Sequence, residues 1–169
     1  AGLAADRQNL RDAIKRVPKG LLEQRPSPER WSVAEILEHL AMIETATVSF
    51  LTPLVETAPL LAPDTHPSPT AIPRDRLRDR STRVTAPEIV QPRGAMTYDQ
   101  AVEALDRSRT SLLLVLEAAA GRDLTAIGRP HPRLGQLDGY QWLAIVGAHE
   151  ERHALQILEI AAELSVDPS

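Results

Sequence analysis

The stretch that decides the fold is Trp31-Ser32-Val33-Ala34-Glu35-Ile36-Leu37-Glu38-His39-Leu40, because it carries a complete helix start. Ser32 and Glu35 form a capping box, in which each side chain accepts the backbone N–H of the other residue. Trp31 before the cap and Ile36 inside the helix can pack as a hydrophobic staple. The inward stripe that follows has helical spacing and comprises Val33, Ile36, Leu37, Leu40, Ile43, Thr47 and Leu51. Pro53 is expected to end or kink this helix.

Two more helix starts share this design, one at Thr97 with Gln100 and one at Asp138 with Gln141. Helical spacing of apolar residues predicts four helices, from about Leu3 to Val17, from Ser32 to Pro53, from Thr97 to Gly121 and from Asp138 to about Leu164. Almost nothing in the chain alternates like a strand. The sequence therefore predicts an all-α four-helix bundle, with residues 1–169 as a single domain.

A long proline-rich connection, residues 58–95, joins the second and third helices. It is long enough to cross the length of a bundle, so these helices need not be antiparallel neighbours. Five arginines in it alternate with acidic residues, which favours a solvated charged turn over an anion-binding patch. They are Arg74, Arg76, Arg78, Arg80 and Arg83.

Composition excludes several classes of function. The 169 residues (18.5 kDa) include 19 Lys and Arg against 23 Asp and Glu, a formal charge of −4, which disfavours nucleic-acid binding. Cysteine is absent, which excludes disulfides, cysteine nucleophiles and thiolate metal sites. The longest apolar run, Leu112 to Leu116, is far short of the roughly 20 residues of a membrane span. We expect a cytoplasmic protein with neither a nucleic-acid nor a membrane partner.

The histidines are the candidate chemical groups. His149 and His153, four residues apart, share one helix face with Cβ atoms about 5–6 Å apart. That face also carries apolar residues, and two buried imidazoles need partners for their nitrogens. A divalent metal resolves this by accepting one nitrogen from each ring. His39 completes a three-histidine site if its helix faces theirs, although by itself it is more typical of a core or boundary position. Three histidine ligands leave a metal position open, which is the mark of a catalytic site.

The segment His149-Glu150-Glu151-Arg152-His153 also matches H-E-x-x-H, the signature of zinc peptidases, with Glu150 as general base. The extended form requires Gly and His three and six residues after His153, where this chain has Gln156 and Glu159. Glu150 is therefore either a base near the metal or a surface residue.

Two histidines lie outside the proposed ligand set. His131 is either a pocket residue that contacts substrate or a residue that orders its loop. His66, between Thr65 and Pro67 in the proline-rich connection, is expected to be exposed.

Three segments resemble the DinB-like (DinB/YfiT-type) superfamily: the opening stretch 31–40, the loop His131-Pro132-Arg133-Leu134-Gly135-Gln136-Leu137, and the last helix with Trp142 and residues 149–157. The resemblance implies a four-helix bundle with a long crossover and frequent homodimers. It also implies a nickel- or zinc-type site with His39, His149 and His153 as ligands. Characterised relatives include metal-dependent thiol transferases and a mycothiol-dependent isomerase.

Three functions follow as hypotheses. The first is a metal-dependent enzyme, a thiol S-transferase or a hydrolase, that acts on a small-molecule substrate, with a low-molecular-weight thiol as possible cofactor. Nickel or zinc is the expected metal, and manganese or iron also accept three imidazoles. The second is a non-catalytic, stress-related binding module with structural histidines. The third is the H-E-x-x-H zinc peptidase.

Overall fold

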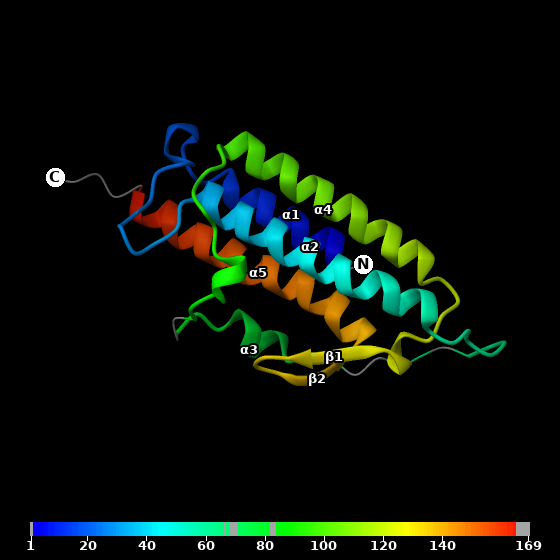
Figure 1. Ribbon diagram of the computed structural model, residues 1–169. Helices are drawn as coiled ribbons and strands as arrows, with labels where there is room; N and C mark the ends of the chain where they lie inside the picture. Colours follow the sequence, from blue (N-terminus) through cyan, green and yellow to red (C-terminus); the bar gives the residue numbers. More distant parts are fainter. Residues whose placement is uncertain (1, 66, 68–70, 82–83, 165–169) are drawn as a thin grey trace.

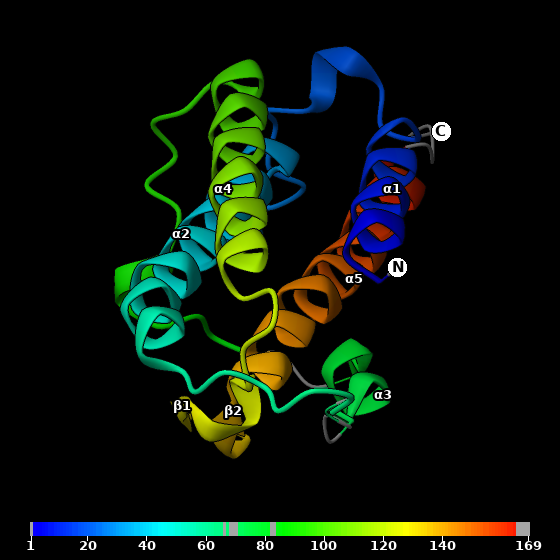
Figure 2. The ribbon, with the colours of Figure 1, turned by 90° about the vertical axis from the view of Figure 1, so that its right-hand side faces the viewer.

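Four long helices form the bundle in the computed structural model, which describes residues 2–65, 67, 71–81 and 84–164. They are α1 (Gly2–Ile14), α2 (Val33–Thr57), α4 (Tyr98–Ala118) and α5 (Gly139–Leu164). Helix α2 packs on α4 and α1 packs on α5 (Figures 1 and 2). The two members of each pair run in the same direction, and the two pairs run in opposite directions (Figure 1). The predicted four-helix bundle is confirmed.

Hydrogen bonds at the helix starts confirm all three capping boxes. Ser32 Oγ accepts the Glu35 N–H at 3.2 Å, and Glu35 Oε2 accepts the Ser32 N–H at 2.8 Å. The pair Thr97 and Gln100 makes the same two bonds, as does the pair Asp138 and Gln141. Each cap satisfies backbone N–H groups that would otherwise lack a partner at the start of a helix.

Helix α2 passes through Pro53 and ends at Thr57, so the expected end at Pro53 is wrong. Leu51 and Val55, on either side of the proline, are buried in the core. Each buried aliphatic side chain stabilises the fold by about 1.5–3 kcal/mol, which offsets the hydrogen bond that proline cannot donate.

A small antiparallel hairpin precedes α5, with strands β1 (Gly128–His131) and β2 (Gly135–Asp138) paired from Gly128–Asp138 to His131–Gly135. The strict all-α expectation missed it, because four-residue strands are too short to show alternation. The described residues also contain three short 3₁₀ turns: η1 (Lys19–Leu21), η2 (Glu88–Val90) and η3 (Leu124–Ala126).

The core has two apolar clusters along the bundle. One contains Leu10, Ile36, Leu37, Ile157 and Ile160. The other contains Leu51, Val55, Leu112, Leu124 and Val146. On each of α2, α4 and α5, at least one buried polar residue lies between the residues of the two clusters.

The connection between α2 and α4 contains the short helix α3 (Arg74–Arg78), which packs on α5, and the turn η2. Because α2 and α4 run in the same direction, this segment has to return from one end of the pair to the other (Figure 1). The course of the whole proline-rich crossover stays a prediction, and His66 and Arg83 lie outside the described residues. Within the part of the chain that is described, no helix is both long and apolar enough to cross a membrane.

Candidate metal centre

The structure brings His39 of α2 together with His149 and His153 of α5. The Nε2 atom of His149 lies 3.1 Å from that of His39 and 2.9 Å from that of His153. One ring nitrogen from each of the three residues lies within 4.8 Å of the others. The three-histidine hypothesis required α2 and α5 to face each other, and they do.

Hydrogen bonds on the far side of two rings set which nitrogen carries the proton. His39 Nδ1 lies 2.6 Å from the carbonyl oxygen of Val90, and His153 Nδ1 lies 2.9 Å from Gln156 Oε1. Both partners are acceptors, so Nδ1 donates in each ring and Nε2 keeps its lone pair. These lone pairs face His149 Nε2.

A proton on His149 Nε2 can bridge toward its neighbours, but it cannot satisfy two lone pairs fully. A cation in place of that proton accepts the Nε2 lone pairs of all three rings. At metal–nitrogen distances of about 2.0–2.1 Å, two ligands at a right angle have nitrogens roughly 2.9 Å apart, close to the separations found here. The three histidines therefore fit a divalent metal and can hold one, and metal–ligand histidines commonly have such Nδ1 acceptors.

Burial keeps the cluster uncharged. It lowers the pKa of His149 to about 3, with a smaller contribution from His39. Burial and the neighbouring His149 hold the pKa of His153 well below its usual value. Burial also lowers the pKa of His39, against the opposing effect of the Val90 carbonyl. Neutral imidazole is the form that binds metal.

The centre is closed on one side and accessible on the other. His39 and His153 are only 2% and 6% exposed, whereas His149 is partly exposed. The Trp31 ring lies 4.9 Å from the His39 ring and 6.4 Å from the His153 ring, between centroids. Trp31 thus packs beside the two buried ligands, and His149 is the ligand nearest to solvent.

His131 lies outside the three-histidine cluster. It ends β1, and its ring centroid lies 5.2 Å from that of Trp142. Its Nδ1 accepts the backbone N–H of Arg133 at 3.1 Å, a contact that orders the hairpin loop. Its charge contributes to the lowered pKa of His149, so a rim position near the accessible histidine stays a prediction.

Glu150 points away from the histidines, although it follows His149 directly. Its Oε1 accepts the Arg7 Nε–H at 2.7 Å and lies 3.1 Å from Arg109 Nη2. The residue is 1% exposed, so the surface interpretation is wrong. Burial raises the pKa of Glu150 despite the two arginines. The carboxylate of Glu150 is held by Arg7 and Arg109, which argues against the peptidase, where this glutamate acts as the general base beside the metal.

Glu150 belongs to a buried ion cluster that has one charged residue from each bundle helix: Arg7, Glu44, Arg109 and Glu150. Glu44 accepts from Arg7 Nη2 at 3.1 Å and from Arg109 Nε at 2.6 Å. Sequence patterning missed this cluster because isolated charges on amphipathic helices are usually exposed.

Sequence analysis also missed the acceptors Val90 and Gln156. The spacing of Gln156, three residues after His153, could have indicated its role. Nothing local to Val90 could have done so, because a backbone carbonyl leaves no sequence signal.

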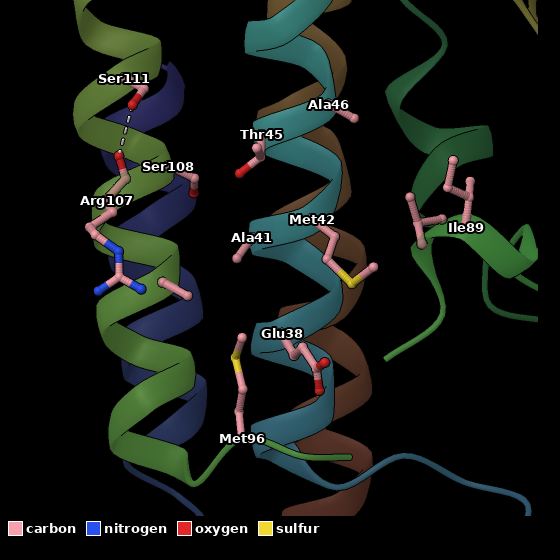
Figure 3. Close-up of a pocket in the computed structure, with 12 residues that line it drawn as sticks. Glu38, Ala41, Met42, Thr45, Ala46, Ile89, Met96, Arg107, Ser108 and Ser111 are labelled. Atoms are coloured by element: carbon pink, nitrogen blue, oxygen red, sulfur yellow. Dashed lines mark hydrogen bonds between the residues drawn. The ribbon is translucent and has the colours of Figure 1, made fainter. Parts of the chain in front are cut away.

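A groove of about 500 Å³ lies elsewhere, along the outer face of α2 and α4. Figure 3 shows Ala41 and Thr45 of α2 opposite Arg107 and Ser111 of α4, whereas Met42 points to the other side of α2, toward Ile89. The three histidines are not among its lining residues. The groove adjoins the candidate metal centre through Val90, which lines it and whose carbonyl oxygen lies 2.6 Å from His39 Nδ1.

Comparison with known proteins agrees with this fold. Residues 3–157 match the DinB superfamily. The chain belongs to the DinB superfamily. Within this superfamily it is similar to the uncharacterized protein YuaE of Bacillus subtilis (strain 168), with 30% identity over 144 residues, or 85% of each chain. The crystal structure of TT2238, a four-helix bundle protein, aligns with a TM-score of 0.54 and 23% identity, and covers 94% of this DinB-superfamily chain and 93% of TT2238. That likeness shows the shared fold.

Proposed function

We propose that this DinB-superfamily protein is a metal-dependent enzyme that acts on a small molecule, either as a thiol S-transferase or as a hydrolase. His39, His149 and His153 hold the metal, with nickel or zinc as the first expectation and manganese or iron as alternatives. The observation that supports this is the convergence of three Nε2 atoms, two of them with their lone pairs directed inward by Nδ1 hydrogen bonds.

When bound, the metal lowers the pKa of a coordinated thiol or water and so supplies a nucleophile near neutral pH. Val90 and Gln156 orient two of the ligands. Trp31 keeps solvent from the buried side. In this proposal a small substrate and a low-molecular-weight thiol reach the metal from the side of His149, the one ligand of the three that is partly exposed.

Metal content is the direct test. Protein purified without a histidine tag is analysed by elemental mass spectrometry as wild type, His149→Ala and His131→Ala. We expect about one divalent ion per wild-type chain, loss of the ion in His149→Ala, and retention in His131→Ala, which removes a histidine outside the cluster. Equal metal in all three proteins would contradict the proposal.

A non-catalytic module is the second candidate, favoured by the commitment of Glu150 to Arg7 and Arg109. Cobalt-substituted protein separates the two candidates. A thiol that binds at an open metal position changes the visible spectrum, whereas a metal closed by a fourth protein ligand leaves the spectrum unchanged. A visible spectrum that changes neither with any of several small thiols nor with pH would favour the non-catalytic module.

A homodimer is a further part of the proposal and rests on the family resemblance. Sedimentation velocity over a range of protein concentrations tests it. A single monomeric species at micromolar concentrations would contradict it.

A further inference from the structure

The α3 strap, defined as residues 74–81, is held on α5 by polar contacts. Helix α3 has no buried residue. Arg74 pairs with Asp6 and Glu151, and Arg78 pairs with Glu151. In the opposite direction, Arg152 Nη1 of α5 donates to the carbonyl oxygen of Leu77 at 3.1 Å. The expected solvated turn is therefore docked on the bundle.

Arg80, in the same strap, reaches a residue that touches a candidate metal ligand. Its guanidinium makes two 2.7 Å hydrogen bonds to the carboxylate of Glu159. Its Nη1 also donates to Gln156 Oε1 at 3.4 Å, the oxygen that accepts the His153 Nδ1–H at 2.9 Å. Glu159, Arg80, Gln156 and His153 thus form one chain of hydrogen bonds from the strap to the ligand.

The shared oxygen gives Arg80 control over the proton on His153. A glutamine amide can rotate by 180° and present its NH₂ group in place of its oxygen. The rotated amide would donate to His153 Nδ1 and move the ring proton to Nε2, where it blocks metal binding. Rotation would also turn the NH₂ group toward Arg80, which is itself only a donor. Arg80 therefore holds the amide in the orientation that keeps the Nε2 lone pair free.

We propose that Arg80 is a positioning residue for His153, acting through Gln156, so that the α3 strap and the metal at the three histidines stabilise each other's binding. The proposal rests on the metal site of the proposed function. It is strengthened by Val90, because the same α2–α4 connection supplies the acceptor for His39. Coupling of this kind is reciprocal. If the docked strap raises the affinity for the metal by some factor, the bound metal raises the equilibrium constant for docking of the strap on α5 by the same factor.

Zinc affinity in four untagged full-length proteins tests the proposal, measured at pH 7.5 by competition with a chromophoric chelator. The proteins are wild type, Arg80→Gln, Arg78→Gln and the double variant Arg80→Gln with Gln156→Glu. Arg78→Gln is the matched control, since Arg78 lies in the same strap and contacts Glu151 of α5.

We expect Arg80→Gln to weaken zinc binding about tenfold, the lower end of the range for outer-shell partners of metal ligands. Arg78→Gln should stay within about twofold of wild type, because it leaves this relay intact. The double variant should regain wild-type affinity, because both oxygens of a carboxylate are acceptors and rotation no longer matters. If Arg80 had only a structural role, the Gln156→Glu substitution would not restore zinc affinity to Arg80→Gln.

Hydrogen exchange of the strap amides, with and without zinc, is the second readout. Zinc should slow exchange in residues 74–81 of wild type, and the gain should shrink about tenfold in Arg80→Gln by reciprocity. Equal affinities in wild type and Arg80→Gln, equal losses in both single variants, or no rescue in the double variant would each overturn the role of Arg80 while leaving the metal site in place. A wild-type protein that binds no zinc, nickel, manganese or iron would overturn both proposals.

Discussion

His149 and Glu150 are neighbours in sequence but belong to two buried polar centres of different character. Glu150 lies in the ion cluster, where two arginines and two glutamates balance each other's charge. His149 lies among three imidazoles that offer lone pairs to one another, and no acidic residue among those described joins them. In the first centre each charge has an opposite charge beside it, whereas the second calls for an added cation. The difference separates a structural centre from a candidate functional one.

The ion cluster also has a geometric consequence. Arg7, Glu44, Arg109 and Glu150 come from α1, α2, α4 and α5 in turn. Their directional hydrogen bonds restrict how the four helices can slide or rotate against one another. Because Glu150 adjoins His149, the cluster sets the rotation of α5 that directs His149 toward His39.

Removal of one charge from the ion cluster should have the largest effect. Glu44→Ala leaves Arg7 and Arg109 short of a counter-charge in the bundle and is expected to destabilise the fold by about 3–5 kcal/mol. Urea unfolding measures the change. Arg11→Ala is the control, because Arg11 pairs with Asp106 at the surface, and it should cost at most about 1 kcal/mol. Equal losses of unfolding free energy in Glu44→Ala and Arg11→Ala would contradict the structural role of the ion cluster.

Metal should stabilise the histidine centre specifically. At a free zinc concentration 100 times the dissociation constant, the free energy of unfolding is expected to rise by about 2.7 kcal/mol. Urea unfolding with zinc, and separately with a chelator, gives the difference. The rise should vanish in His153→Ala and persist in His131→Ala. A similar rise in His153→Ala would place zinc elsewhere.

Acid should destabilise the metal-free protein through the same residues. The folded-state pKa of His149 is about 3, below the ordinary value of about 6.5. Between these values the unfolded chain binds a proton at His149 that the folded chain does not, so stability is full above pH 6.5 and is lost as the pH falls.

This histidine should contribute about 1.4 kcal/mol for each pH unit in that window. Urea unfolding at pH 6.0, 5.5 and 5.0 in a chelator measures the slope. His149→Ala should show a shallower slope than wild type, and identical slopes would show that His149 is protonated in the folded protein.

A surface arginine should have the smallest effect. Arg78 is 45% exposed and pairs with Glu151 at 3.1 Å, so Arg78→Gln is expected to cost no more than about 1 kcal/mol. Addition of 1 M NaCl to wild type should loosen the α3 strap by screening such pairs, measured as faster proteolysis near residues 74–81. A loss as large as that from Glu44→Ala would show that the strap is part of the core.

The sequence predicted the elements whose determinants are local. The three capping boxes placed the starts of α2, α4 and α5, because their residues lie within four positions of one another. The histidine pair of α5 was readable for the same reason. His39 was a ligand only on the condition that its helix faced theirs, and the resemblance to the DinB-like superfamily supplied the full ligand set.

Other features that depend on distant partners were not readable. Arg7 is separated in sequence by 37 residues from Glu44 and by 143 residues from Glu150, and no local pattern indicates either ion pair. Pro53 shows the opposite error: the local rule predicts an end or a kink at this residue, and the end is wrong, because α2 continues to Thr57 with Leu51 and Val55 buried in the core. The acceptor at Val90 required the fold itself.

Helix α5 carries two of the three candidate ligands, and His39 lies 110 residues before the nearer of them. During synthesis on the ribosome, a nascent chain that ends before α5 can present only one of these imidazoles. Such a chain can compete only weakly for a cellular metal ion. The cofactor would therefore be acquired after α5 has emerged and docked, which makes loading a late event in the maturation of this protein.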